Sequence, residues 1–217
     1  ATNSGGVSLG RNGEVIGVAM LKTPLRYSEA ILHYVDFLLR QHALKLSQID
    51  CFAVATGPGS FTGLRIGLAT AKAFSKGLQT PVAGISTLEA LAYRFRHLGG
   101  LVAPLIDARR QQVYAAVYRA QDMALSLQQP EAVAAPADWL KRLQPAPYWF
   151  VGDGVAHCRT ALAALHPGAH LLDTDNSILY ELCQLAYRRV IEGTTISGDQ
   201  IQANYLRPSD VRRPSTP

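Results

Sequence analysis

The fold is constrained most by one stretch, residues 54–67, which read VATGPGSFTGLRIG. An apolar run typical of a buried strand leads into it, and a helical pattern continues to about residue 78. Gly57 and Gly59 permit a sharp turn that a residue with a Cβ enters only with strain. Ser60 follows where a helix N-cap belongs, because its hydroxyl can accept a free backbone N–H of the first turn. The stretch therefore predicts a strand, a tight loop and a helix in direct succession.

This loop is also a candidate anion or nucleotide contact, through Gly57, Gly59 and Ser60. Free N–H groups and the helix dipole point the same way at a helix N-terminus, and both favour negative charge. The spacing fits neither the phosphate loop of nucleotide triphosphatases nor the dinucleotide fingerprint. A strand-to-helix joint needs glycine with or without a ligand, so a purely structural interpretation stays open.

Composition indicates an ordinary globular protein. The chain has 217 residues, 48% hydrophobic and 17% charged, enough for one large domain or two small ones. The formal net charge of +5 fits a partner that is RNA, but the basic residues are scattered. Scattered charge is more typical of a solvated surface than of a nucleic-acid footprint, which gathers on one face.

Cysteine usage and hydropathy indicate the compartment. The cysteines Cys51, Cys158 and Cys183 lie far apart, without a C-x-x-C spacing. A sparse, odd count favours reduced thiols in the cytosol over a disulfide framework. No run approaches the length of a membrane span, and residues 1–20 lack the pattern of a signal peptide. We therefore expect a cytoplasmic protein without membrane contact.

The order of expected elements predicts two α/β lobes of related plan. A strand hairpin followed by alternating helices and strands occurs twice, with a glycine-rich break at residues 98–100. We expect the domains at residues 1–97 and 98–217, and a polar, glutamine-rich link between residues 119 and 137. The expected strands are residues 6–9, 15–21, 51–55, 82–85, 101–106, 112–119, 149–151 and 171–172. The expected helices are residues 27–42, 60–78, 86–97, 137–143, 158–165 and 178–191.

Several motifs together resemble the bacterial TsaB (YeaZ) family. They are GPGSFTGLRIG, YSEAILHYVDFLL, GISTLEALA, IDARRQQVYAAVY and a closing NYLRP. The resemblance implies the two-lobed fold of actin, hexokinase and Hsp70 (ASKHA), with mixed sheets flanked by helices. In that family the turn at residues 2–6 follows a first strand that ends in Asp-Thr. We therefore expect that first strand to be absent from this chain.

The residues do not predict a metal site. Only His166 and His170 have a helical ligand spacing, and Pro167 between them breaks the helix, so we expect surface histidines. The catalytic paralogue TsaD carries a histidine pair where the resemblance places Thr87 and Leu91 of this chain. Neither side chain replaces an imidazole as a metal ligand. The resemblance thus implies a chain with no catalytic residue and no metal.

Two further features are local. Ser86 and Glu89 have the spacing of a capping box, in which each side chain accepts one N–H at the helix start. Asp107 and Arg109 lie at the expected turn of the second hairpin and are candidate contacts to an anion or nucleotide. Asp107 can equally cap the turn, and Arg109 can pair with it.

Two helices of the first lobe carry the candidate partner surface. The first helix, residues 27–42, has an apolar arc too wide for one sheet face to cover, which predicts burial on two sides. The second helix, residues 60–78, repeats small residues every four positions. These small residues form a groove that another backbone can approach. That backbone can belong to a partner or to the protein's own sheet; the wide arc favours a partner. The candidate partner-binding residues are Ala30, Tyr34, Phe37, Gly63, Gly67 and Ala71.

We therefore interpret the chain as a non-catalytic scaffold subunit. The resemblance implies that it pairs with and activates a TsaD-like enzyme, which forms threonylcarbamoyladenosine next to the anticodon of ANN-decoding tRNAs. Further expected partners are a TsaE-like ATPase and tRNA through the complex, with a homodimer when the chain is alone. ATP or ADP is expected only in the complex. The alternatives are a glycoprotease-like metallopeptidase or a phosphotransferase of the actin-like superfamily, and a module that binds tRNA directly.

Overall fold

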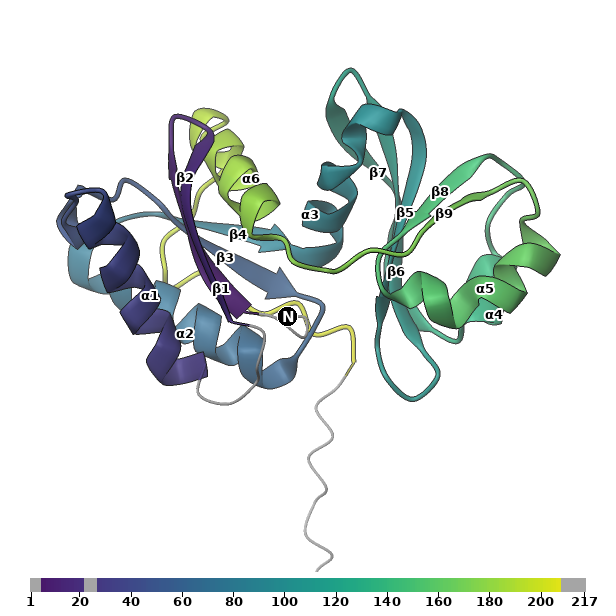
Figure 1. Cartoon of the computed structure of the whole chain (residues 1–217), viewed down its shortest axis with the longest axis horizontal. Coiled ribbons are helices and arrows are strands. Elements are labelled where there is room, and N and C mark those ends of the chain that lie inside the picture. The colour runs from purple at the N-terminus through teal and green to yellow at the C-terminus, as the bar shows by residue number, and fades with distance from the viewer. Residues whose placement is uncertain (1–4, 22–26, 208–217) are drawn as a thin grey trace, which may run out of the picture.

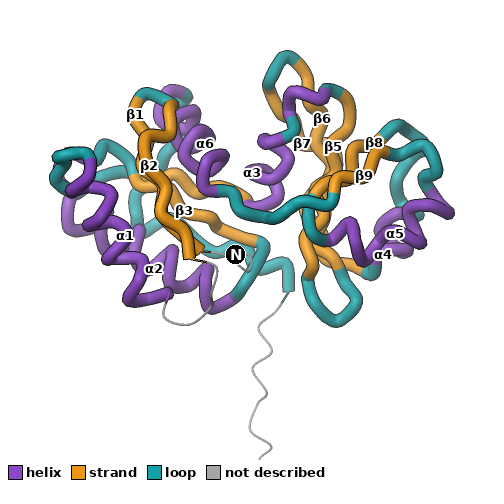
Figure 2. Tube along the Cα trace, viewed as in Figure 1, coloured by secondary structure: helices purple, strands orange, loops and turns teal. Residues whose placement is uncertain are grey.

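The computed structural model describes residues 5–21 and 27–207, and it has two α/β lobes side by side (Figure 1). Strands form the middle of each lobe and helices lie on the outside, with one helix, α3, between the lobes (Figure 2). The predicted mixed α/β fold is confirmed. Of the predicted turn at residues 2–6, residues 2–4 lie outside the described residues.

The strands of the first lobe form two separate pairs. β1 and β2 make an antiparallel hairpin, and β3 and β4 pair in parallel. Asn12 and Gly13, with φ of 53° and 84°, make the tight turn that their sequence predicts. Within the described part of the chain, no strand joins the two pairs. The elements are β1 (Gly5–Arg11), β2 (Glu14–Leu21), α1 (Tyr27–Gln41), β3 (Phe52–Gly57), α2 (Phe61–Leu78) and β4 (Val82–Ser86).

The second lobe is built on one continuous sheet of five strands, in the order β7-β6-β5-β8-β9. β5, β6 and β7 are antiparallel, whereas β8 and β9 continue from β5 in parallel. Its core includes Leu105, Leu140, Phe150 and Leu162, each at most 1% exposed. The elements are β5 (Gly100–Asp107), β6 (Val113–Gln121), β7 (Ala124–Ala134), α4 (Pro136–Leu140), β8 (Tyr148–Val151), α5 (Gly154–Leu165) and β9 (His170–Leu172).

The predicted glutamine-rich link was wrong, because those residues form β7, a strand of 11 residues at the sheet edge. β7 is antiparallel to β6, with Ser126 and Gln128 exposed and Gln129 and Glu131 half-buried. Pro130 lies where the register shifts between Ala115 and Val117, and edge strands and bulges are where proline is tolerated. The pairing, rather than an apolar alternation, makes this segment a strand.

The chain returns to the first lobe through α6 (Leu179–Ile191), which packs against β1, β2 and β4 (Figure 1). Ile196 then forms a bridge with Val82 at the free edge of β4. The predicted second domain spans residues 98–217. Its last third therefore includes segments that lie on the first lobe. The lobes are connected twice along the chain.

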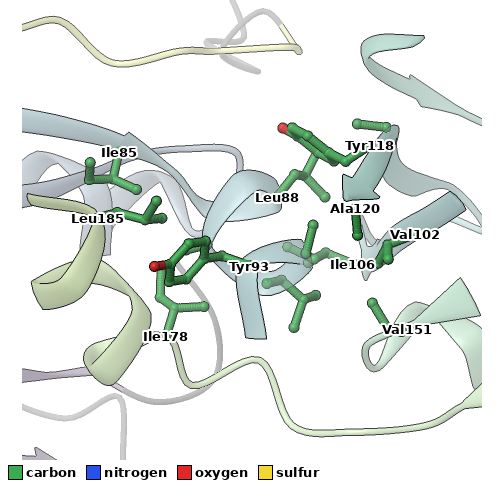
Figure 3. Close-up of a cluster of buried hydrophobic side chains, with 14 of the residues drawn as sticks. Ile85, Leu88, Tyr93, Val102, Ile106, Tyr118, Ala120, Val151, Ile178 and Leu185 are labelled. Atoms are coloured by element: carbon green, nitrogen blue, oxygen red, sulfur yellow. The ribbon is translucent and has the colours of Figure 1, made fainter. Parts of the chain in front are cut away.

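A shared core surrounds α3 (Thr87–Arg94) and joins the lobes. Figure 3 shows Leu88 and Tyr93 of α3 between Ile85 and Leu185 of the first lobe, with Val102 and Ile106 of the second on the other side. The helix ends at Arg94 and a 3₁₀ turn, Arg96–Leu98, follows. Burial on both sides of α3 fixes the lobes to each other.

Candidate functional site

The glycine loop has the conformation that its sequence predicts. Gly57 has a φ of 117°, in the region that favours glycine, and Gly59 has a φ of 159°. Ser60 is the N-cap of α2, and its side chain accepts the backbone N–H of Gly63 at 3.3 Å. The predicted strand, loop and helix are therefore confirmed as local structure.

The C-terminal segment, residues 201–207, packs over this loop. The backbone N–H of Asn204 donates to the Thr56 carbonyl at 2.8 Å. A Cβ built on Gly57 would lie 2.8 Å from the Asn204 carbonyl oxygen, so glycine is also required by this close approach. The ring of Tyr205 lies 5.2 Å from that of Phe61, the first residue of α2. The loop is thus a packed element with Ser60 at its exposed end.

The Asp107 turn is held from several sides. The Asp107 carboxylate accepts the backbone N–H of Arg109 at 2.7 Å and contacts its guanidinium at 3.2 Å. His157 Nε2 lies 3.6 Å from the same carboxylate, and the Asp107 backbone N–H donates to Asp153 at 2.9 Å. Arg109 has a φ of 61°, which the carboxylate cap supports. The turn-capping interpretation of Asp107 and Arg109 therefore matches these contacts.

The C-terminal segment is what connects the two candidate anion contacts. Asn204 reaches the glycine loop, and Arg207 donates to the Ala108 carbonyl at 3.1 Å and to the Gln112 side chain. The loop belongs to the first lobe and the turn to the second. Residues 201–207 therefore link the glycine loop of the first lobe to the Asp107 turn of the second.

A polar cluster around Glu131 lies at the same junction and was not predicted. The Glu131 carboxylate on β7 accepts from the Ser86 hydroxyl, from Asn204 Nδ2 at 2.7 Å and from Tyr118 Oη at 3.4 Å. Burial, more than the nearby Glu89 charge, raises the pKa of Glu131 above its ordinary value. Burial likewise raises the pKa of Tyr118, and the Glu131 charge adds to this. The cluster ties β7 to the start of α3 and to the C-terminal segment.

The capping box is only half formed. Ser86 caps α3 as predicted, accepting from the N–H groups of Leu88 at 3.1 Å and Glu89 at 3.2 Å. The Glu89 carboxylate instead pairs with Arg189 of α6, at 2.8 and 3.0 Å. Its predicted role as the reciprocal cap is wrong, because a cation on α6 offers it a charge-assisted partner.

The positions discussed for a metal are in the core. Thr87 and Leu91 are both 0% exposed. Among the described residues, no three His, Cys, Asp or Glu side chains gather as a metal-binding group. The expectation that His166 is a surface residue was wrong, because α4 covers it. It is 8% exposed, and its Nε2 lies 3.1 Å from the Leu140 carbonyl. His170 stacks on Trp149.

The candidate partner residues fall into two sets. Phe37 points outward from α1 and is 52% exposed, whereas Ala30 and Tyr34 are half-buried. On α2, Ala71 is buried, and a Cβ on Gly67 would lie 3.4 Å from the Val54 side chain of β3. The small residues of α2 thus face the protein's own strand. All the candidates except Phe37, including Gly63, line one cavity inside the first lobe.

No helix within the described residues has the length and apolar character needed to cross a membrane.

Comparison with known proteins then gives the family. Residues 17–196 match the family model described as TsaD: tRNA N6-adenosine threonylcarbamoyltransferase. That model covers most of both lobes, from within β2 to Ile196, five residues after the end of α6.

Curated relatives and solved structures agree with that match. The Escherichia coli (strain K12) tRNA threonylcarbamoyladenosine biosynthesis protein TsaB is 30% identical over 216 residues, covering 95% of this chain and 91% of the relative. The Bacillus subtilis (strain 168) TsaB is 34% identical over 154 residues, 63% of this chain and 66% of the relative. The structure of YeaZ from Pseudomonas aeruginosa superimposes with a TM-score of 0.79 at 27% identity, covering 94% of this chain and 95% of that one. The chain belongs to the TsaB (YeaZ) family of tRNA threonylcarbamoyladenosine biosynthesis proteins.

Proposed function

We propose that this chain is a non-catalytic subunit that pairs with a TsaD-like enzyme and supports threonylcarbamoyladenosine formation next to the anticodon of tRNA. The observation that carries the proposal is the match to a TsaB protein over almost the whole of both chains. A shared fold alone would say little about function. Here the match includes the glycine loop, the Asp107 turn and the segment that bridges them.

The core positions of α3 support the non-catalytic role. The family's enzyme carries histidines where this chain has Thr87 and Leu91. Both side chains are fully buried, and Leu91 belongs to the apolar core that joins the lobes. An apolar side chain and a hydroxyl cannot replace two imidazoles on a metal. Catalysis then belongs to the partner.

The outer face of α1 is the proposed contact for that partner. Leu32 and Phe37 are each 52% exposed on this helix. A partner that covers this helix would remove both apolar side chains from water. Ala30 and Tyr34 lie on the same helix and would border the contact. The same face would form a homodimer when the chain is alone.

The junction between the lobes is the proposed place for a nucleotide or other anion in the complex. Gly57, Gly59 and Ser60 lie on one side of the bridging segment, and Asp107 and Arg109 on the other. A TsaE-like ATPase, ATP or ADP, and tRNA would then meet this chain only through the assembled complex. The setting for this reaction is the cytoplasm.

Reconstitution tests the proposal. The purified chain, a TsaD-like enzyme and a TsaE-like ATPase are combined with threonylcarbamoyl-AMP and unmodified tRNA, and nucleosides are measured by mass spectrometry. We expect product only when all three proteins are present. Product formed by this chain alone would assign catalysis to it and overturn the proposal. Full activity of the other two proteins without it would deny it a role.

A further inference from the structure

Two exposed aromatic rings and a cation lie in contact where the C-terminal segment, residues 201–207, passes the start of α2 (Figure 1). The centre of the Tyr205 ring lies 5.2 Å from that of Phe61, and the rings are inclined at 39°. The guanidinium carbon of Arg65 lies 3.8 Å from the centre of the Phe61 ring. Phe61 is 37% exposed and Tyr205 is 44% exposed. We call Phe61 and Tyr205 the aromatic pair.

The C-terminal segment is anchored by residues other than Tyr205. Ile201 is 3% exposed and belongs to the core cluster that includes Val54. The backbone N–H of Asn204 donates to the Thr56 carbonyl at 2.8 Å and fixes the segment beside the glycine loop. The fold therefore holds the segment from its backbone and from Ile201, while the ring of Tyr205 stays partly in water.

The two elements that carry the aromatic pair have only positive charge. α2 and residues 201–207 contain no Asp or Glu, and their charged residues are Arg65, Lys72, Lys76 and Arg207. Arg207 donates to the neutral oxygens of Ala108 and Gln112. Among the described residues, neither Arg65 nor Arg207 forms an ion pair with a carboxylate. Both guanidinium charges can therefore bind an anionic partner.

The carboxylates at the neighbouring junction do not cancel this charge. Asp107 is held by the guanidinium of Arg109, and the Glu131 carboxylate accepts from the Ser86 hydroxyl. Both carboxylates are half-buried, whereas Arg65 is exposed. A ligand that approaches from solvent therefore meets the aromatic pair and the cations first.

We propose that the aromatic pair stacks against a base of single-stranded RNA and that Arg65 and Arg207 bind the phosphates on either side of it. Exposed aromatic rings stack on unpaired bases, and guanidinium groups match phosphate oxygens. In order of contact the two rings lie between the two cations, because Arg65 covers Phe61 and Arg207 follows Tyr205 by two residues. This order matches a base with a phosphate on each side, and therefore a strand instead of a mononucleotide.

This RNA contact rests on the proposed role in tRNA modification and adds to it the residues of this chain that would touch the tRNA. One stacked base and two phosphates give weak binding. The contact would therefore act when the assembled complex holds the rest of the tRNA and raises the local concentration of the strand. A short RNA still measures it on the full chain alone.

Two labelled RNAs of about seven nucleotides test the contact, a length within the range of single-strand sites. The probe is oligoadenylate, and its control has the same backbone with abasic sites in place of the bases. Fluorescence anisotropy at low salt should show saturable binding of the probe, about fivefold or more tighter than that of the control, because the control cannot stack. Two phosphate contacts predict a slope of about −1.4 for the logarithm of the binding constant against that of the salt concentration, about 0.7 per phosphate.

Variants assign the contact to these side chains. Tyr205→Leu should weaken probe binding about fivefold or more and leave binding of the abasic control unchanged, whereas Tyr205→Phe should bind as the parent does. Tyr180→Leu is the matched control, because Tyr180 is a 57% exposed tyrosine on α6. Arg65→Gln should reduce the magnitude of the salt slope by about 0.7. Arg142→Gln, at an exposed arginine of the second lobe, should not.

Three results would overturn the proposal. Absent binding, or equal affinity for the probe and the abasic control, would show that no base is stacked. AMP that displaces the probe with equal affinity would identify a mononucleotide site. A TsaD-like enzyme that blocks the probe and slows hydrogen exchange at residues 201–207 would identify a protein contact. None of these measurements uses the transfer reaction, so the RNA contact can fail while reconstitution succeeds.

Discussion

The two lobes repeat one plan but differ in how their sheets are completed. The second lobe has five hydrogen-bonded strands and a core with fully buried side chains such as Phe150. The first lobe has two separate strand pairs around a cavity of about 720 Å³. Exposed Leu32 and Phe37 also lie on this lobe, on α1.

The difference indicates a division of labour. The second lobe uses its strand edges within one sheet of five strands. The first lobe carries the proposed partner face on α1, with exposed Leu32 and Phe37. The shared core around α3 and the Glu131 cluster then hold the first lobe against the second. We therefore expect the second lobe to govern stability and the first lobe to govern association.

The largest expected effect is on the stability of the second lobe. Phe150→Ala removes a ring that is 0% exposed and should lower the free energy of unfolding by about 3–5 kcal/mol. Phe52→Ala removes the same side chain from a half-buried position beside the cavity, and about 1–2 kcal/mol is expected. Urea denaturation of both variants measures the difference. Equal losses would show that the first lobe is packed as tightly as the second.

Binding to a TsaD-like enzyme should depend on the first lobe and not on the second. Phe37→Arg places a charge on the proposed contact and should cost about 2 kcal/mol or more of binding to a TsaD-like enzyme, at least tenfold in Kd. Leu127→Arg is its matched control, because Leu127 is 54% exposed on β7 against 52% for Phe37. Neither exposed site should change stability by more than about 0.5 kcal/mol. Calorimetric titration beside thermal unfolding tests both, and normal binding by Phe37→Arg would place the contact elsewhere.

Removing the Glu131 contacts between the lobes should have an intermediate effect on the free energy of unfolding. Glu131→Ala leaves Ser86 and the Asn204 amide without their acceptor, which should cost about 1–3 kcal/mol of unfolding free energy. Because the ring of Tyr118 remains packed, the second lobe should keep its own structure. Hydrogen exchange should therefore accelerate mainly in α3 and residues 201–207. Uniform acceleration across β5 and β8 would show that Glu131 stabilises the sheet instead.

The pH dependence at Glu131 follows from its raised pKa. The folded protein holds this proton more tightly than the unfolded chain, so the stabilisation is complete below the ordinary pKa of 4.5. It is lost as the pH rises through the raised value. Glu131→Gln removes this titration, so the stability of the parent relative to the variant should be greatest in acid and fall toward neutral pH. Parallel stability curves from pH 4 to 8 would contradict the shift.

Features with contiguous signals could be predicted from the sequence. The Asn12-Gly13 turn, the Ser60 cap and the glycine loop depend on residues within a few positions of one another. Their predicted elements match the structure closely. β7 was missed because its polar residues do not alternate, and pairing with β6 makes it a strand.

The junction between the lobes could not be predicted, because its contacts join distant residues. Glu131 meets Tyr118, Ser86 and Asn204 across 13, 45 and 73 positions. His166 was expected at the surface, and its burial comes from Leu140 of α4, 26 positions away. An isolated glutamate among the apolar residues at the end of β7 was the one available signal. The partner residues on α1 and α2 stay predictions.

Hydrogen exchange of the chain with and without a saturating TsaD-like enzyme tests the division of labour most directly. Slower exchange is expected across α1, with the largest change from Leu32 to Phe37, and no change is expected in β7 of the second lobe. Slower exchange confined to the second lobe, or unchanged exchange in α1 at saturation, would contradict it.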